Sequence, residues 1–473
     1  MLFNSIEYFV FFPLAVFVYF VLVQRYRVLW LLLCSCYFYM VFRPVYVLIL
    51  FFTIVVDYFA GLAIGGTENA KKRKMWLVVS LVANLGILVF FKYYNFFTSS
   101  INELFGFLHI SSRGSLLDIL LPVGLSFHTF QAMSYTIEVY RNNQKPEKNF
   151  LVYALYVMFF PQLVAGPIER PQNLLHQFYK KYEPDLERIN SGMRLIVWGL
   201  FKKMVVADRL APWVNTVYGN VRNYSGPEFV GATFLFAFQI YYDFSAYTDI
   251  ARGSARVLGF ELMKNFERPY AALSVRDFWR RWHISLSTWF KDYVYVPLGG
   301  NRVGVFRASL NLLFVFFLSG LWHGANWTYV IWGLLNGVYL VFGNLTRNIR
   351  SKWGEIFFGK REFFRSFFQW LTVFILINIA WVFFRVENLS DAGYIFSHLG
   401  SGWGSVGGAW ILTNLNKLAF IGVGLAVVEL VEWGNIKTKI LERKVLIPAL
   451  VLAVLFILFF GSFQNQQFIY FQF

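Results

Sequence analysis

The chain has 473 residues, of which 58% are hydrophobic and 21% aromatic, whereas only 15% are charged. Soluble domains carry about 25% charged residues, so this composition excludes an ordinary soluble enzyme and predicts a polytopic membrane protein. The formal net charge of +17 would suggest nucleic-acid binding in a soluble chain, but the basic residues of membrane proteins collect in cytoplasmic loops. We therefore expect the lipid bilayer, and no nucleic acid, as a partner.

Apolar runs of about membrane length recur through the first 140 residues. The expected spans are 6–23, 28–42, 45–64, 75–97 and 116–140. No basic residue precedes the first span and no small-residue cleavage site follows it, so we do not expect a cleaved signal peptide. Cys34 and Cys36 lie two residues apart on an expected helix, so they point to different faces and cannot form a disulfide with each other.

The simple pattern ends after residue 149, because the apolar run at 150–164 is too short for a full span. It leads into 161–171, a stretch full of helix breakers. Irregular backbone at membrane depth is tolerated only where protein or a water-filled cavity covers it. We therefore expect 161–171 to form the lip of a cavity, with a charged connector at 179–189 after it.

Two further spans, 193–211 and 229–250, contain charged residues at membrane depth. These residues are Lys202, Lys203, Asp243 and Asp249. Asp249 and Arg252 are three residues apart, so they can pair on one helix face. We expect this structural role for both.

Residues 265–302 are too polar for a lipid-exposed span and too aromatic for a free loop. Four residues of this stretch fall at i, i+4, i+7 and i+11, and would share one face of a continuous helix. They are Arg276, Arg280, His283 and Ser287. We expect a re-entrant or interfacial amphipathic helix, for whose arginines anchoring at the membrane surface is the alternative. The turn at 297–302 could offer backbone donors to a phosphate, but this motif is weak.

A second histidine, His323, lies between Gly320 and Gly324 in an apolar, aromatic-rich stretch. An ionisable side chain at membrane depth is costly, so its presence favours a functional role. The alternative is a hydrogen bond that joins two membrane helices and does nothing else. The two glycines remove side-chain bulk and allow another backbone or a substrate to approach the ring. His283 lies 40 residues upstream in another apolar stretch. Two histidines at membrane depth fit acid–base chemistry better than a hydrogen bond that only joins two helices.

The C-terminal third alternates apolar spans with polar connectors. The expected spans are 306–318, 329–342, 367–384, 418–431 and 446–460, with a basic connector at 347–365 and a loop at 387–416. These bring the total to about eleven hydrophobic segments, some of them re-entrant, in an all-α polytopic membrane protein. We expect residues 1–473 to form a single membrane domain, with a catalytic core at 265–345 and an aromatic tail at 462–473.

Five stretches carry a resemblance to a known family. They are RDFWRRWHISLS at 276–287, DYVYVPLGG at 292–300, LWHG at 321–324, VAGPI at 164–168 and FIYFQF at 468–473. The chain resembles the membrane-bound O-acyltransferase (MBOAT) superfamily and, within it, the bacterial alginate O-acetyltransferase branch. The resemblance implies a ring of helices around a thin central wall, where a cytoplasmic donor and an outside acceptor meet. The branch also contains cell-wall and other exopolysaccharide acetyltransferases.

The resemblance also implies the reaction. Acyl transfer from a thioester to a hydroxyl needs a base that takes the hydroxyl proton, and desolvation favours the neutral, basic imidazole. We assign His323 as this base and expect His283 to orient the nucleophile or stabilise the oxyanion. The expected donor is acetyl-CoA, with an acyl carrier protein as the alternative because one serves a related D-alanyl system. We expect no tightly bound cofactor and no metal site.

Five basic residues are candidates for holding the phosphates of the donor. They are Arg276, Arg280, Arg281, Lys291 and Arg302. Arginine suits this role because its guanidinium fork can bind two phosphate oxygens at once. The competing interpretation is that these residues bind anionic lipid.

The last six residues contain the third catalytic candidate, Tyr470. Their spacing, F-x-Y-x-x-F, resembles the C-terminal motif of a small partner subunit in the related D-alanylation system, where the resemblance implies a tyrosine that carries the acyl group. Carried over to this chain, Tyr470 takes the acetyl group and passes it to an extracytoplasmic acetyltransferase of the SGNH type. An aromatic anchor at the lipid headgroups is the alternative.

We therefore predict an enzyme of the bacterial cytoplasmic (inner) membrane that passes acetyl groups across it for O-acetylation of a polysaccharide. An alginate-type exopolysaccharide comes first as acceptor, and peptidoglycan or another cell-wall glycan next. The alternative is a transporter of an acyl or glycan substrate without chemistry, because broken helices and buried charges are common in transporters. We see no internal repeat, which argues against it. A purely structural subunit of a secretion complex would leave both histidines unexplained.

Overall fold

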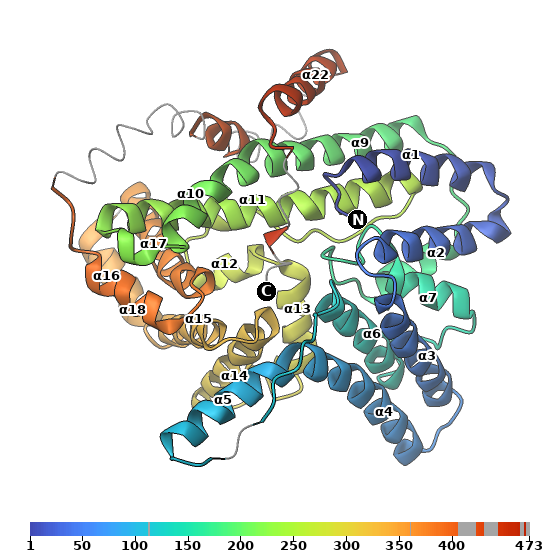
Figure 1. Ribbon diagram of the computed structural model, residues 1–473, viewed down its shortest axis with the longest axis horizontal. Coiled ribbons are helices and arrows are strands. Elements are labelled where there is room, and N and C mark those ends of the chain that lie inside the picture. The colour runs from blue at the N-terminus through green and yellow to red at the C-terminus, as the bar shows by residue number, and fades with distance from the viewer. Residues whose placement is uncertain (112–113, 360, 405–421, 430–442, 464–467, 470–473) are drawn as a thin grey trace. The chain divides into compact units, whose positions relative to one another are not determined.

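The structure is a computed structural model that describes residues 1–111, 114–359, 361–404, 422–429, 443–463 and 468–469 (Figure 1). Among these residues all regular structure is helical and none is strand, as the sequence predicts. They group into two compact units. The N-terminal unit comprises Met1–Gly199 and Tyr247–Met263, and the C-terminal unit comprises Leu200–Ala246 and Lys264–Ile469. The single membrane domain stays a prediction.

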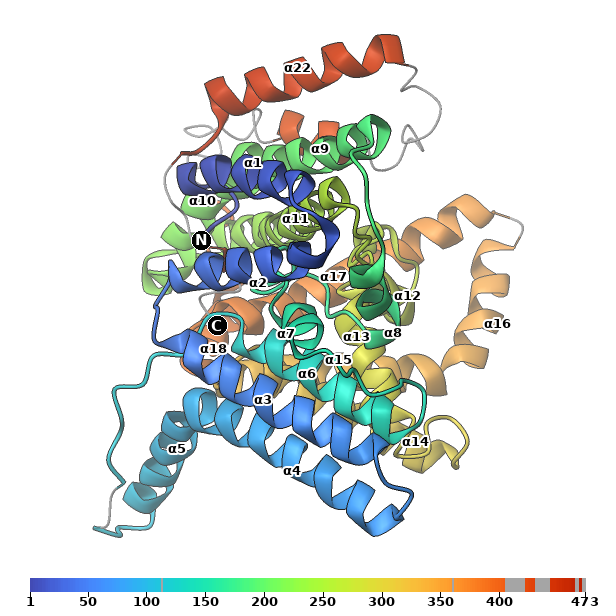
Figure 2. The same cartoon turned by 90° about the vertical axis from the view of Figure 1, so that its right-hand side faces the viewer.

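The helices of the N-terminal unit begin with four that follow the expected spans (Figures 1 and 2). The elements are α1 (Ile6–Val21), α2 (Gln24–Met40), α3 (Tyr46–Gly65), α4 (Ala70–Leu88), η1 (Val89–Tyr93), α5 (Tyr94–Phe107), α6 (Leu125–Tyr140), α7 (Phe150–Met158), α8 (Pro171–Leu174), η2 (Leu175–Tyr179) and α9 (Leu186–Leu200). In both views α3 and α4 lie side by side. Between them the buried Asp57 carboxylate accepts hydrogen bonds from Ser80 Oγ (2.6 Å) and Asn84 Nδ2 (2.9 Å). A carboxylate on a membrane helix is thus stabilised by polar neighbours.

The expected span 116–140 is wrong at its start, because α6 begins only at Leu125. The residues before it are not helical up to Gly124, which has a φ of +77°. A Cβ atom at Gly124 would lie 2.9 Å from the carbonyl oxygen of Leu163. A side chain there would both strain the backbone and collide with the 159–169 stretch, so glycine permits this close approach.

The stretch of helix breakers is irregular, as predicted, and lies inside the protein. α7 ends at Met158, and every residue from 159 to 169 is buried. The Phe160 N–H donates to Ser35 Oγ (3.0 Å), and the Tyr156 hydroxyl donates to the Glu169 carbonyl (2.9 Å). Protein groups therefore satisfy backbone that lipid could not. The role of this stretch as the lip of a cavity stays a prediction.

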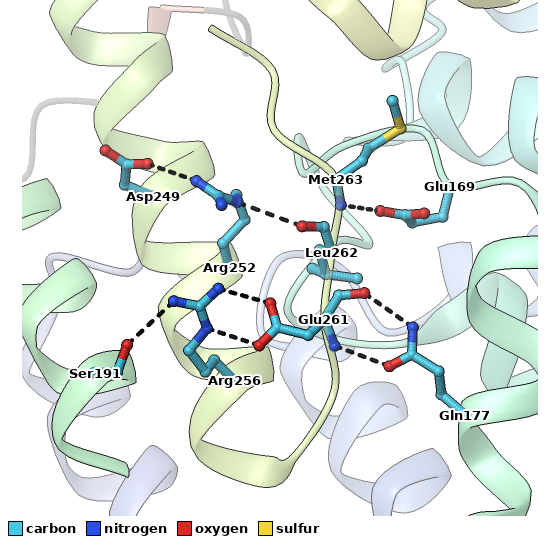
Figure 3. Close-up of polar contacts among 9 residues, drawn as sticks. All are labelled: Glu169, Gln177, Ser191, Asp249, Arg252, Arg256, Glu261, Leu262 and Met263. Carbon is cyan, nitrogen blue, oxygen red and sulfur yellow. Dashed lines mark hydrogen bonds and ion pairs between the residues drawn. The ribbon is translucent and has the colours of Figure 1, made fainter. Parts of the chain in front are cut away.

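The loop that follows α11 (Gly226–Leu258) is held on two sides by polar contacts (Figure 3). Glu261 and Gln177 exchange two hydrogen bonds between the side chain of Gln177 and the backbone of Glu261 (2.9 and 3.0 Å). The Glu261 carboxylate in turn pairs with Arg256 (2.7 Å). The buried Glu169 carboxylate accepts from the Met263 N–H (2.5 Å). These contacts fix the backbone directly before residues 264–283.

The predicted pair of Asp249 and Arg252 is present in the same region, with 3.4 Å between Arg252 Nη1 and Asp249 Oδ1. Arg252 also donates to the carbonyl of Leu262 (3.4 Å), so it contributes to holding the loop after α11 (Figure 3). The structural role expected for both residues is confirmed.

The C-terminal unit contains the long helix pair of the predicted catalytic core. Its elements, besides the first part of α11, are η3 (Phe201–Ala207), α10 (Asp208–Tyr218), η4 (Val221–Asn223), η5 (Pro269–Ala271), α12 (Val275–Arg281), α13 (Ile284–Phe290), η6 (Lys291–Tyr295), α14 (Val305–His323), α15 (Trp327–Leu345), α16 (Arg347–Phe358), α17 (Glu362–Arg385), α18 (Leu389–His398) and α22 (Arg443–Phe460). α14 and α15 lie side by side (Figures 1 and 2).

Two expected connectors of this unit contain helices instead. α16 occupies most of the basic connector at 347–365, and α18 lies in the expected loop at 387–416. α18 begins where the Asn388 side chain accepts from the Asp391 N–H (2.9 Å). Such a cap provides a partner for a backbone N–H that has none at a helix start. Because the segment is polar, its composition predicts a loop rather than the helix that forms here. Of the expected span 418–431, residues 422–429 are helical, and the rest lies outside the described residues.

Five helices of the described residues are long and apolar enough to cross a membrane. They are Tyr46–Gly65, Ala70–Phe107, Val305–His323, Trp327–Leu345 and Glu362–Arg385. α1 is apolar but has only 16 residues. The chain is therefore a multi-pass membrane protein, whereas the predicted total of about eleven hydrophobic segments stays unconfirmed.

Candidate active site

The predicted continuous helix across His283 is wrong, because two short helices replace it. α12 ends at Arg281 and α13 begins at Ile284. His283 between them has φ +44° and ψ +56°, in the left-handed region that side chains other than glycine rarely adopt. The face expected to join Arg276 and Arg280 to His283 therefore ends with α12. Local strain of this kind persists only where surrounding contacts impose it.

Asn265 supplies those contacts. Its backbone carbonyl accepts from the Ile284 N–H (2.9 Å), and its side-chain Oδ1 accepts from the Ser285 N–H (3.1 Å). The Glu267 N–H donates to the carbonyl of Arg281 on the other side of the break (2.9 Å). Residues 265–267 thus stabilise both ends of the break, and the backbone at His283 is held in place from outside its own helix.

The His283 side chain is buried, with 1% of its surface exposed, among aromatic rings. Its ring centroid lies 4.7 Å from that of Phe244, 5.9 Å from that of Trp322 and 6.5 Å from that of Phe266. The apolar surroundings favour the neutral imidazole over the imidazolium.

His323 is the last residue of α14 and is also buried. Its ring centroid lies 4.9 Å from that of Trp322, 4.8 Å from that of Trp332 and 5.3 Å from that of Phe384. The Trp322 ring is therefore in contact range of both histidines. The structure brings His283 and His323 against one indole although they come from different elements.

Glycines allow α14 and α15 to approach closely at His323. A Cβ atom at Gly320 would lie 2.3 Å from the Tyr329 carbonyl oxygen, and one at Gly333 would lie 2.2 Å from that of Phe316. At Gly324 it would meet the Tyr329 ring at 2.2 Å. The structure shows the approach of a neighbouring helix, which is one of the two possibilities that the glycines left open. Small residues at helix contacts have this role in membranes.

The five predicted donor-binding residues come from α12, η6 and the turn before α14. Arg276 and Arg280 are exposed on α12, four residues apart, and Arg276 donates to Asn344 Oδ1. Arg281 instead pairs with Asp277 (3.0 Å), which offsets its charge. Lys291 on η6 and Arg302 in the turn before α14 are both exposed. The turn itself contains Gly299 (φ +105°) and Gly300 (φ +54°).

Comparison with known proteins decides the family. Residues 143–385 match the family model described as the membrane-bound O-acyltransferase family. The chain belongs to the membrane-bound O-acyltransferase family. A probable alginate O-acetylase of Pseudomonas aeruginosa is 35% identical over 472 residues, which cover 98% of this chain and 82% of that relative. A peptidoglycan O-acetyltransferase of Helicobacter pylori is 36% identical, with 83% of this chain and 78% of that relative covered.

A more distant relative is a teichoic acid D-alanyltransferase of Streptococcus thermophilus, which is 27% identical over 249 residues. That match covers 50% of this chain and 59% of the relative. The protein is therefore a membrane O-acyltransferase. These relatives do not support the alternative of a transporter without acyl-transfer chemistry.

Sequence reasoning named the two histidines of the candidate site but missed the roles of two other residues, Trp322 and Asn265. Trp322 belongs to the LWHG stretch and precedes His323, but nothing in the sequence indicated that it also lies against His283. Asn265 lies at the edge of the expected helix, and its capping role depends on how residues 265–267 fold back to the break at His283. The catalytic candidate Tyr470 lies outside the described residues.

We expect Asn265→Ala to lower the free energy of unfolding of the acyltransferase by about 1 kcal/mol, the usual cost of a lost helix cap. Turnover of a thioester donor should fall as well, because the backbone at His283 loses a restraint. Asn265→Asp keeps an acceptor for the Ser285 N–H and should regain most of the stability. Thermal unfolding of the purified protein and release of the donor thiol measure the two effects. Wild-type unfolding and turnover in Asn265→Ala would show that this cap does not hold His283.

Proposed function

We propose that this membrane acyltransferase transfers acetyl groups from cytoplasmic acetyl-CoA to an acceptor outside the bacterial cytoplasmic membrane. The final acceptor is a polysaccharide, an alginate-type exopolysaccharide first and peptidoglycan or another cell-wall glycan second. The names of the relatives in Pseudomonas aeruginosa and Helicobacter pylori support these two acceptors. An acyl carrier protein is the alternative donor.

The observation that carries the proposal is the position of the two histidines. Both are buried, and both rings lie within 6 Å of the Trp322 ring, at 5.9 Å for His283 and 4.9 Å for His323. A base and a second polar group held together in dry surroundings suit acyl transfer, because electrostatic interactions are stronger where water is excluded. If each histidine only joined two helices by a hydrogen bond, there would be no reason for both rings to lie against the indole of Trp322.

In the proposed step His323 takes the proton of the attacking hydroxyl while the hydroxyl oxygen bonds to the thioester carbonyl carbon. The bond from that carbon to sulfur then breaks, and the acyl group stays on the hydroxyl oxygen. The leaving thiolate accepts the proton from His323. His283 orients the hydroxyl or donates to the oxyanion that forms on the carbonyl oxygen. Such proton transfer contributes on the order of a hundred- to ten-thousand-fold to the rate.

Several buried polar atoms of the C-terminal unit support a polar ligand in this unit. In the described part of the chain, no hydrogen-bond partner is found for Asn265 Nδ2, Trp279 Nε1, Thr328 Oγ1 or Asn336 Oδ1. The Trp279 ring lies 5.7 Å from that of Trp332, which contacts His323. Buried polar atoms without partners are rare in folded proteins, and substrate groups or water would satisfy them.

The donor's phosphates are assigned to the exposed basic residues Arg276, Arg280, Lys291 and Arg302. Arg281 was also a candidate, but its pairing with Asp277 weakens the case for it. Binding of anionic lipid headgroups by these residues remains the competing role.

Tyr470 is proposed as the residue that receives the acetyl group and passes it to an extracytoplasmic acetyltransferase of the SGNH type. A phenol is a suitable carrier, because it attacks with the help of a base and forms an ester reactive enough for a second transfer. The proposal for Tyr470 rests on its place in the C-terminal motif.

We expect His323→Ala to lower acetyl transfer by about a hundredfold or more, because the general base is lost. Expression and thermal unfolding should stay near those of the wild type. His176→Ala is the matched control, because His176 is an exposed histidine, and it should retain full activity. Release of free CoA from acetyl-CoA by the purified protein measures the rate. A well-folded His323→Ala protein with near-wild-type release would disprove this role.

Tyr470→Phe keeps the aromatic ring and removes only the hydroxyl, so membrane anchoring should survive and acetylation should stop. Mass spectrometry of the C-terminal peptide after incubation with acetyl-CoA should find acetyl-tyrosine in the wild type and none in the variant. Tyr37→Phe, at an exposed position of α2, controls for the loss of a hydroxyl elsewhere. The relay is excluded if Tyr470→Phe acetylates the polysaccharide at the wild-type rate.

A further inference from the structure

The C-terminal end of the chain is attached to η3 and its neighbours at three points. Arg209 Nε donates to the carbonyl of Phe460, the last residue of α22 (3.0 Å). The Ser462 N–H donates to the carbonyl of Met204 (2.9 Å). The Ile469 N–H donates to Asp243 Oδ2 (2.8 Å), and this last bond is buried.

The π-helical bonding of η3 explains why Met204 can accept one of these bonds. In an α-helix the Asp208 N–H would bond to the Met204 carbonyl, four residues back. Here it bonds to the carbonyl of Lys203, five residues back, and to that of Val206. The Met204 carbonyl accepts from Ser462 N–H instead. Single π-turns of this kind occur often at functional sites.

The third attachment point, Asp243, belongs to a buried charged cluster. Lys203 Nζ lies 2.8 Å from Asp208 Oδ1 and 2.8 Å from Asp243 Oδ1, and all three side chains are less than a tenth exposed. One ammonium group thus faces two carboxylates. Removing such charges from water is costly, and further hydrogen bonds are needed to offset that cost. The Ile469 N–H provides one to Asp243.

This attachment places the described end of the tail near His283. Phe468 and Ile469 are buried, with 1% and 4% of their surfaces exposed. The Phe468 ring lies 5.6 Å from that of Phe244, the residue after Asp243. Phe244 in turn lies 4.7 Å from the His283 ring. Phe244 therefore lies between Phe468 and His283, with its ring tilted to both.

We propose that Asp243, held by Lys203, is a positioning residue that docks Phe468 and Ile469, near the C-terminus, beside His283. The role in acyl transfer rests on the proposed function, since the residue that follows Ile469 is the proposed acyl carrier Tyr470. The docking itself does not depend on that function. Asp243 touches neither donor nor acceptor and acts through the position of the tail.

The docking is tested by hydrogen–deuterium exchange of the C-terminal peptide in the full-length purified protein. Asp243→Asn keeps the size of the side chain but replaces a charged acceptor by a neutral one, which bonds more weakly. We expect hydrogen–deuterium exchange of the Ile469 N–H to become about tenfold faster. A hydrogen bond to a charged group favours the closed, protected state by about tenfold or more, and the neutral amide loses most of that protection. Asp391→Asn removes an aspartate from α18 and should leave this exchange unchanged. Unchanged exchange in Asp243→Asn would overturn the docking.

The role in transfer is tested with a second variant that leaves the charged cluster intact. Ile469→Pro removes the N–H that donates to Asp243, and it also fixes φ and replaces the buried isoleucine side chain. Both Ile469→Pro and Asp243→Asn should lower acetyl incorporation into the C-terminal peptide about tenfold, with the KM for acetyl-CoA unchanged. The double variant should lose little more than either single one, because both remove the same contact. Full incorporation in Ile469→Pro would overturn the positioning role. If the wild type incorporated no acetyl group, the proposed function would fail while the exchange result still decided the docking.

Discussion

Burial of ionisable side chains among apolar and aromatic groups is the constraint on which the rest of this protein depends. Away from water, a charged or polar group must find partners within the protein or it destabilises the fold. Asp57 is satisfied by Ser80 and Asn84 on the neighbouring helix. Lys203 is satisfied by two carboxylates. The candidate histidines lie in the same kind of environment but are surrounded mainly by rings. Burial of the His283 ring among other rings favours its neutral imidazole over the imidazolium.

Interruptions of regular helix position the groups that matter for function. The break at His283 orients one histidine away from the path that a continuous helix would impose, and Asn265 stabilises it. The π-turn at η3 makes a backbone carbonyl available to the C-terminal segment. The irregular stretch at 159–169 contributes Glu169, which helps to hold the loop after α11. At η3 a regular α-helix would have used the Met204 carbonyl within its own backbone and left it unable to hold Ser462 in the same way.

What the sequence predicts well is local. The pair of Asp249 and Arg252 follows from their spacing on one helix, and the end of α7 follows from the helix breakers after it. The charges at Lys203 and Asp243 could be recognised as unusual, but their pairing joins two elements and has no sequence signal. The break at His283 was missed for the same reason, because helical periodicity continues through it and only Asn265, on a separate segment, stabilises it. The family resemblance placed both histidines in one predicted site, but it could not show that both rings lie near Trp322.

The most direct measurement is a double-mutant cycle on the two histidines, with the rate of CoA release from acetyl-CoA as the readout. Residues that act together in one step are strongly non-additive, because either change alone removes most of the benefit. Joint action around Trp322 predicts that the variant with both His283→Ala and His323→Ala releases CoA only slightly more slowly than His323→Ala alone. If instead the two losses multiplied, the histidines would act independently, and a single acyl-transfer site built from both would be contradicted.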